Sequence, residues 1–212
     1  MRIGRAALAA CCFAAAAIGL AAVEPKAPLT PDAPPLQPGD PPPGQLLIAS
    51  AQIADPRFHH AVVLVVRHDK DGAFGIVINR PVAEETIAKL LQSTGEDAAG
   101  IEGSVRVFAG GPVEPELGFL LHDADYRRPE TMPVDGKVAL TASKDAIRDI
   151  GLHKGPRKYL FALGYTGWGP GQLEAEVARN DWFAVVEDPA LVFDEERGAV
   201  WDKALARRGQ EL

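Results

Sequence analysis

The sequence predicts an α+β fold: a mainly antiparallel sheet, curved toward a flattened barrel, with about four helices packed outside it. Short β-branched runs and helical patterns do not alternate strictly, which argues against the repeated βαβ units of a parallel sheet. The strand-like runs instead come in neighbouring pairs, as antiparallel strands do. Turn residues at Asp71-Gly72 and around Gly110 predict hairpins that allow the sheet to curl.

The first half of the predicted fold contains three strands and one helix. Residues 45–51 and 61–66 are short apolar runs, the second of them rich in valine, and both predict buried strands. A third strand is expected over 73–78. Asn79-Arg80-Pro81 ends it, because proline cannot continue a ladder of hydrogen bonds. Apolar residues at helical spacing then predict a helix over 84–92, followed by a polar loop over 93–103.

The second half of the predicted fold adds strands at 105–108, 119–122, 137–141, 158–164, 182–186 and 191–193. Ser143 is a good N-cap for a helix over 144–151. Pro170-Gly171 stands at the start of the next helix, which ends near Asn180, and a closing helix is expected over 197–208. Residues 164–183 hold four glycines and two tryptophans, so we expect tight backbone turns there that fix a short helix onto the sheet.

Three segments make up the chain: a signal peptide or N-terminal anchor at 1–23, a proline-rich linker at 24–43, and a globular domain at 44–212. Two arginines precede eighteen uncharged residues, which is the pattern of an export signal. We therefore expect an exported, periplasmic protein. The alternatives are a lipidated Cys11, an uncleaved anchor, or a true start near Val23, which would leave the protein cytoplasmic.

The net charge of −7 argues against direct nucleic-acid binding, because an acidic surface repels phosphates. Cleavage after the leader would remove two arginines and bring the net charge to −9. Contact with a membrane is expected only through an uncleaved leader. Beyond the two adjacent cysteines at the N-terminus the chain has no thiol, so no disulfide forms within the domain.

Several short sequence motifs resemble those of the YqgE/AlgH family of bacterial proteins. They lie at 44–49, 72–81, 110–113, 121–122, 164–168, 171–176, 180–182 and 201–205, in the family's order. The resemblance covers 44–209 and implies a compact fold with a largely antiparallel sheet bent toward a barrel. Members are often labelled transcriptional regulators, and the resemblance implies no defined activity.

Seven residues are candidates for a binding rim at strand ends: Asn79, Arg80, Gly110, Gly111, His122, Trp168 and Gln172. Arg80 would suit a carboxylate or phosphate, and the glycine pair would present backbone N–H groups. Each also has a structural interpretation, in which Asn79 holds turn backbone, Arg80 pairs with an acid, the glycines form a tight turn, and Trp168 fastens a turn to the core. Gln172 and Glu176 share one face of their helix, whereas Glu174 and Glu176 do not.

These observations favour a non-catalytic regulatory or binding module for a partner protein or small ligand. No cofactor, metal site or catalytic residue is predicted, because no nucleophile–base pair, metal-ligand spacing or phosphate-loop sequence is present. The first alternative is a hydrolase with His122 or His68 as general base, paired with Asp69, Asp71 or Asp123. The second is a transcriptional regulator that acts indirectly.

Overall fold

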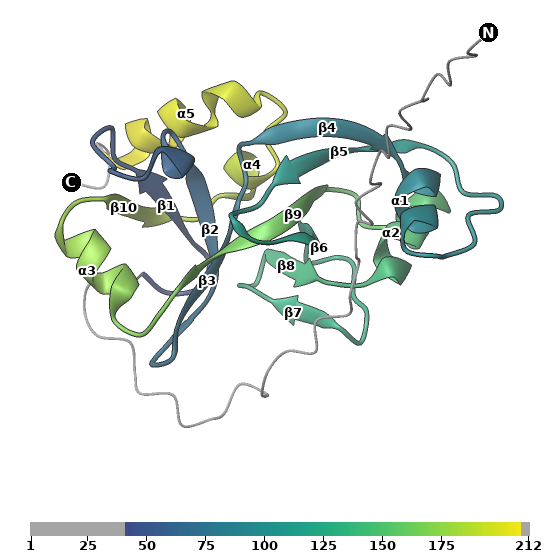
Figure 1. Ribbon diagram of the computed structural model, residues 1–212, viewed down its shortest axis with the longest axis horizontal. Coiled ribbons are helices and arrows are strands. Elements are labelled where there is room, and N and C mark those ends of the chain that lie inside the picture. Colours follow the sequence, from purple (N-terminus) through teal and green to yellow (C-terminus); the bar gives the residue numbers. More distant parts are fainter. Residues whose placement is uncertain (1–40, 209–212) are drawn as a thin grey trace, which may run out of the picture.

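One long strand, β9 (Tyr159–Trp168), lies at the centre of the sheet in the computed structural model, which describes residues 41–208. The last residues of β9 pair with antiparallel β3 (Gly72–Val77). Its first residues lie between β5 (Ser104–Ala109), which is parallel to it, and antiparallel β6 (Val113–Asp123). In this way β9 joins the two halves of a ten-stranded sheet (Figure 1).

The first half of the sheet has the strand order β10-β1-β2-β3, with β1 at Gln45–Ala49, β2 at Val62–Asp69 and β10 at Trp182–Val186. All neighbours are antiparallel, with Leu47 opposite Ala184 and Leu46 opposite Leu64. Successive residues of β2 enter two different apolar clusters, one on each face. This burial on both faces explains why β2 is a continuous apolar run and not an alternating one.

The second half of the sheet surrounds the start of β9. On one side β5 pairs with β4 (Pro81–Thr86), and on the other β6 pairs with β8 (Val138–Thr141), which pairs with the short β7 (Thr131–Pro133). A third apolar cluster fills the space between this half and the helix pair α1 and α2.

Within the described part of the chain, five α-helices pack around the curled sheet (Figure 1): α1 (Ile87–Ser93), α2 (Lys144–Gly151), α3 (Gln172–Ala178), α4 (Pro189–Val192) and α5 (Val200–Arg208). Two 3₁₀ turns, η1 (Pro56–Phe58) and η2 (Arg197–Ala199), complete the elements of residues 41–208. Side chains cap three helices as expected of such residues: Thr86, Ser143 and Asp188 accept from backbone N–H groups of the first turn. The predicted fold class, a curved and mainly antiparallel sheet with helices outside, is confirmed.

One predicted helix begins later than expected, and one predicted strand is wrong in type. The helix predicted over 84–92 is present but begins at Ile87, because residues 81–86 form a strand, in which proline is allowed at the first position when the strand pairs on one side only. Residues 191–193 do not form a strand. Asp188 accepts from the N–H of Ala190 and Pro189 starts a short helix, so a cap overrides the β propensity of the apolar run.

The hairpin predicted around Gly110 is also wrong, because β5 and β6 do not pair. They lie on opposite sides of β9, and the chain crosses β9 at Gly110-Gly111. The Gly110 N–H donates to the Leu163 carbonyl at 2.7 Å, and the Gly110 carbonyl accepts from Val77 N–H at 2.8 Å. The Asp71-Gly72 hairpin, by contrast, connects β2 to β3 as predicted.

The predicted leader at 1–23 and the linker up to residue 40 lie outside the described residues, as do residues 209–212. Among residues 41–208, none of the helices has the length and apolar content needed to cross a bilayer.

Candidate functional site

Two hollows open on either side of Arg197, which contributes to the lining of both. The first has a volume of about 280 Å³ and is lined by residues of the β1–β2 loop, the end of β3, and the start of α5: His59, His60, Asn79, Arg80, Arg197, Gly198, Trp201 and Asp202. The second has a volume of about 510 Å³ and lies against β4, β5 and the start of β9. Both volumes suit a small ligand or a short segment of a partner.

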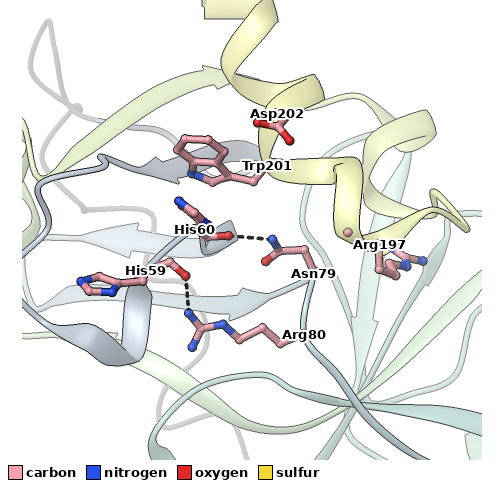
Figure 2. Close-up of a pocket in the computed structure, with 8 residues that line it drawn as sticks. His59, His60, Asn79, Arg80, Arg197, Trp201 and Asp202 are labelled. Atoms are coloured by element: carbon pink, nitrogen blue, oxygen red, sulfur yellow. Dashed lines mark hydrogen bonds between the residues drawn. The ribbon is translucent and has the colours of Figure 1, made fainter.

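Asn79 and Arg80 form the floor of the first hollow and hold the loop before β2 (Figure 2). The Asn79 side chain accepts from Val62 N–H at 2.9 Å and donates to the His60 carbonyl at 2.8 Å. The Arg80 guanidinium donates to the carbonyls of Arg57 and His59, the latter at 2.7 Å. Burial lowers the pKa of Arg80 from its usual value. Asn79 thus holds turn backbone as expected, and Arg80 binds carbonyl oxygens, not an acid.

An aromatic pair forms one wall of the first hollow. The rings of His60 and Trp201 lie 4.4 Å apart at an angle of 38°, and the Trp201 indole donates to the Ala49 carbonyl at 2.9 Å. His60 has a left-handed backbone with φ of 55°, a conformation that is uncommon outside glycine and that asparagine, aspartate and histidine adopt more often than other residues. Exposed Asp202 contributes a carboxylate beside this wall.

Gly110 does not offer a free N–H group to an anion, because it donates to the Leu163 carbonyl, and both glycines occupy the crossing over β9. A Cβ on Gly110 would lie 2.3 Å from the Gly164 carbonyl oxygen, and one on Gly111 would lie 2.1 Å from the Tyr165 carbonyl. The glycines are therefore required so that two backbones can approach each other closely. This is a structural role, and neither glycine lines either hollow.

His122 is fully buried, and both of its ring nitrogens take part in hydrogen bonds. Nδ1 lies 2.8 Å from the Asp123 carbonyl oxygen and Nε2 lies 2.9 Å from the Thr141 hydroxyl. Burial lowers the pKa of His122. His68 is similar: Nδ1 lies 2.8 Å from the Pro41 carbonyl oxygen and Nε2 lies 3.1 Å from Glu174, a carboxylate that sequence reasoning did not pair with it. Neither proposed base has a ring nitrogen free for a substrate.

Trp168 and Gln172 lie on the far side of the sheet from the first hollow, around α3. The strand β9 continues to Trp168, so this residue ends a strand and does not stand in the glycine turn where we predicted it. The indoles of Trp168 and Trp182 both donate to one oxygen of Glu176, at 2.9 and 2.8 Å, and Gln172 donates to the other at 2.8 Å. This arrangement fastens α3 to the sheet.

Of the seven predicted rim residues, only Asn79 and Arg80 line a hollow together; the others lie in three separate places. Similarity to known proteins identifies the family independently of this placement. The AlgH-like family model matches residues 46–212, most of the described chain. The chain belongs to the AlgH-like family.

Two relatives of this AlgH-like chain illustrate the match. A UPF0301 protein of Cereibacter sphaeroides is 44% identical over 167 residues, which cover 78% of this chain and 91% of that protein. Another, from Caulobacter vibrioides, is 45% identical over 168 residues and covers 78% and 86%. The resemblance seen in the sequence is thereby confirmed.

Solved structures agree with the fold. The solution structure of the AlgH protein from Pseudomonas aeruginosa is 35% identical, with a TM-score of 0.69 and coverage of 82% of this chain and 92% of that one. A crystal structure from Corynebacterium diphtheriae has a TM-score of 0.64 at 17% identity and supports the fold alone.

The sequence did not predict several residues that line the hollows of this AlgH-like chain, above all Arg197. It follows Asp194, Glu195 and Glu196, a charged run that indicates solvent exposure, yet only 7% of Arg197 is exposed. His60 and Trp201 were missed for a different reason. Their rings meet only because the β1–β2 loop and α5 fold against each other, and no spacing in the sequence reports that contact.

A buried carboxylate, Glu187, lies outside both hollows. Its two oxygens have no hydrogen-bond partner among the described residues, and the Lys137 ammonium is 3.5 Å from one of them. Burial, together with nearby Asp135, raises the pKa of Glu187 to about 7. Within residues 41–208 no group of three His, Cys, Asp or Glu side chains is arranged to hold a metal ion.

Proposed function

We propose that this AlgH-like chain is a non-catalytic binding module whose first hollow holds a small ligand or a segment of a partner protein. One observation carries the proposal: the side chains around the hollow are already fixed by internal hydrogen bonds. Asn79, Arg80 and Trp201 each bond to backbone groups of neighbouring strands or loops. A binding surface fixed in advance loses little conformational entropy when its ligand arrives.

The chemistry of the first hollow suits a ligand with a flat apolar part and a hydrogen-bond donor. The His60–Trp201 pair offers an aromatic face, and Asp202 has no ion-pair partner among the described residues. Asp202 is therefore available to accept from a donor on the ligand.

An enzymatic function is the second candidate, and the His68–Glu174 pair is the observation that favours it. A carboxylate beside a histidine is the arrangement that orients a general base. Against this reading, the His68 side chain is 2% exposed and its other nitrogen bonds to the Pro41 carbonyl. Binding without catalysis accounts better for these positions.

His60→Asn tests the first hollow, because asparagine tolerates the left-handed backbone but lacks the ring. His153→Asn is the matched control: His153 is also exposed, has φ of 58°, and lies outside both hollows. Each full-length variant would be immobilised and incubated with bacterial metabolite extract and with soluble protein, and retained species would be quantified by mass spectrometry. We expect at least one species to be retained by the wild type and His153→Asn but not by His60→Asn. If no species separates His60→Asn from its control, the first hollow is not the binding site.

Two further parts of the proposal concern biological context. We propose that any effect on transcription is indirect, since the acidic chain repels phosphates; salt-dependent binding of the purified protein to a specific DNA would contradict this. We also propose export to the periplasm, supported by the basic and apolar N-terminal residues. N-terminal sequencing of protein from fractionated cells tests that assignment.

A further inference from the structure

Arg197 is a buried cation that lacks an acidic partner, and its charged end faces the second hollow. Figure 2 shows its side chain directed away from His60, Asn79 and Trp201. The guanidinium carbon lies 5.0 Å from the centre of the Phe108 ring, and Phe108 lines the second hollow but not the first. The guanidinium therefore lies at the wall of the second hollow.

The hydrogen bonds of Arg197 are incomplete. Its Nη1 donates to the carbonyls of Val192 at 2.7 Å and Ile78 at 3.4 Å, whereas the buried Nε has no partner. Among residues 41–208 no carboxylate lies within ion-pair distance of this guanidinium. Burial lowers its pKa, and the more distant carboxylates of Glu195 and Asp194 offset only part of this effect. A buried charge without a counter-charge is unfavourable, and a bound anion would supply the missing partner.

The remaining charges around the second hollow add to this positive field. Arg106, Arg157, Lys158 and Arg197 line it together with two acids, Glu84 and Glu195, in a chain whose net charge is −7. Arg157 is already paired with Asp125 at 2.6 Å, so the excess of positive charge rests on the other three cations. Lys158 forms no ion pair with any described residue, and Arg106 meets only a highly exposed carboxylate of Glu195 at 3.6 Å. An excess of positive charge in a concave site attracts anions selectively.

Aromatic side chains line the same hollow. Tyr159 and Phe193 are partly buried and lie beside the cations, and Phe108 packs beneath Arg197. The volume of about 510 Å³ is larger than a bare phosphate or carboxylate needs. The lining therefore suits an anionic group joined to a flat apolar body.

We propose that the second hollow is a binding site for a small organic anion, whose phosphate or carboxylate contacts Arg197 and Lys158 and whose flat body lies against Phe193 and Tyr159. This site is separate from the first hollow. Arg197 supplies a positively charged donor that suits either anion, and the aromatic rings favour an aryl or similar planar group.

Phenyl phosphate tests the proposal, with inorganic phosphate and phenol as its two halves and benzoate as the carboxylate counterpart. Isothermal titration calorimetry of the full chain should show saturable binding of phenyl phosphate or benzoate, weakened by salt and at least about tenfold tighter than either half of phenyl phosphate. Arg197→Lys should weaken binding by about tenfold to a hundredfold, because lysine keeps the charge but loses the planar guanidinium that the Val192 and Ile78 carbonyls hold in place.

Lys158→Met tests the same site in a variant that we expect to fold like the wild type, because Lys158 is exposed. It should weaken binding by about two- to fivefold, whereas Lys154→Met, an identical charge change outside the hollow, should not. His60→Asn should leave phenyl phosphate binding unchanged, so that failure at the first hollow is distinguished from failure at the second. Absence of saturable binding, equal affinity for inorganic phosphate alone, or an equal loss in Lys154→Met would overturn the proposal.

Discussion

Glu176 fastens α3 to the sheet by accepting hydrogen bonds from Trp168 and Trp182, and we call this contact the clamp. Replacing Glu176 by methionine tests its importance. One Glu176 oxygen accepts from both buried indoles, Trp168 at 5% and Trp182 at 2% exposure. Methionine keeps the length of the side chain but accepts neither bond, so two buried N–H groups lose their partner. At about 1.5 kcal/mol for each, the free energy of unfolding should fall by about 3 kcal/mol. For a domain of this size that lowers Tm by about 6–12 °C.

Urea denaturation followed by circular dichroism and tryptophan fluorescence measures this loss. Two variants calibrate it. Glu176→Gln keeps one acceptor oxygen and should lose about 1 kcal/mol. Gln172→Ala removes two exposed bonds, one to the same carboxylate and one from the Gly169 N–H, and should lose less than Glu176→Met. A Glu176→Met protein that unfolds within about 1 kcal/mol of the wild type, with unchanged tryptophan emission, would refute the assignment of the clamp to Glu176.

Three other perturbations have defined outcomes. Arg80→Met should lower the free energy of unfolding by about 1–2 kcal/mol and raise amide exchange in residues 55–60, because two loop carbonyls lose their donor; unchanged exchange would contradict this role. Gly110→Ala should prevent stable folding, as judged by circular dichroism, whereas the control Gly136→Ala should fold normally because no atom lies within 4 Å of its added Cβ. A stable Gly110→Ala protein would contradict the close crossing over β9. The folded-state pKa of Glu187, about 7, exceeds its unfolded value of 4.5, so the folded state binds the extra proton between these values and its stability falls as pH rises through that window. Glu187→Gln should therefore be more stable than the wild type at pH 8 but not at pH 4.5, and exposed Glu195→Gln should show no such change; a Glu187→Gln difference independent of pH would contradict the raised pKa.

Much of the fold could be predicted because local signals agreed with tertiary packing. Ser143 caps α2 as predicted, and the apolar run of β2 is buried on both faces. The failures arose where a local rule has an exception. Pro81 starts a strand that pairs on one side, where its missing N–H is tolerated, and Asp188 turns an apolar run into a helix.

The chain crossing at Gly110 could not be predicted, because the sequence does not report that β9 passes between two strands that are neighbours in the chain. The glycine pair was recognised as a tight backbone feature, but tightness alone does not distinguish a hairpin from a crossing. The same reasoning applies to β9. Its glycines predicted a turn, but in the fold they lie within the strand.

The candidate site was the least predictable part. Asn79 and Arg80 were identified as residues at a strand end, and they do lie together in the first hollow. Gly110, His122 and Trp168 shared the same polar or glycine-rich signature but serve packing, because burial decides their role and the sequence does not report it. Arg197 was missed for the opposite reason, since a charged run concealed a buried cation.

Binding without conversion is the central claim, and native mass spectrometry of the full chain tests it most directly. The protein would be incubated with a bacterial small-molecule extract, desalted, and weighed before and after denaturation. We predict a complex whose released ligand has the same mass as a compound in the untreated extract, in His68→Gln and His122→Gln as in the wild type. Release of a chemically altered compound by the wild type, lost in either histidine variant, would contradict the account.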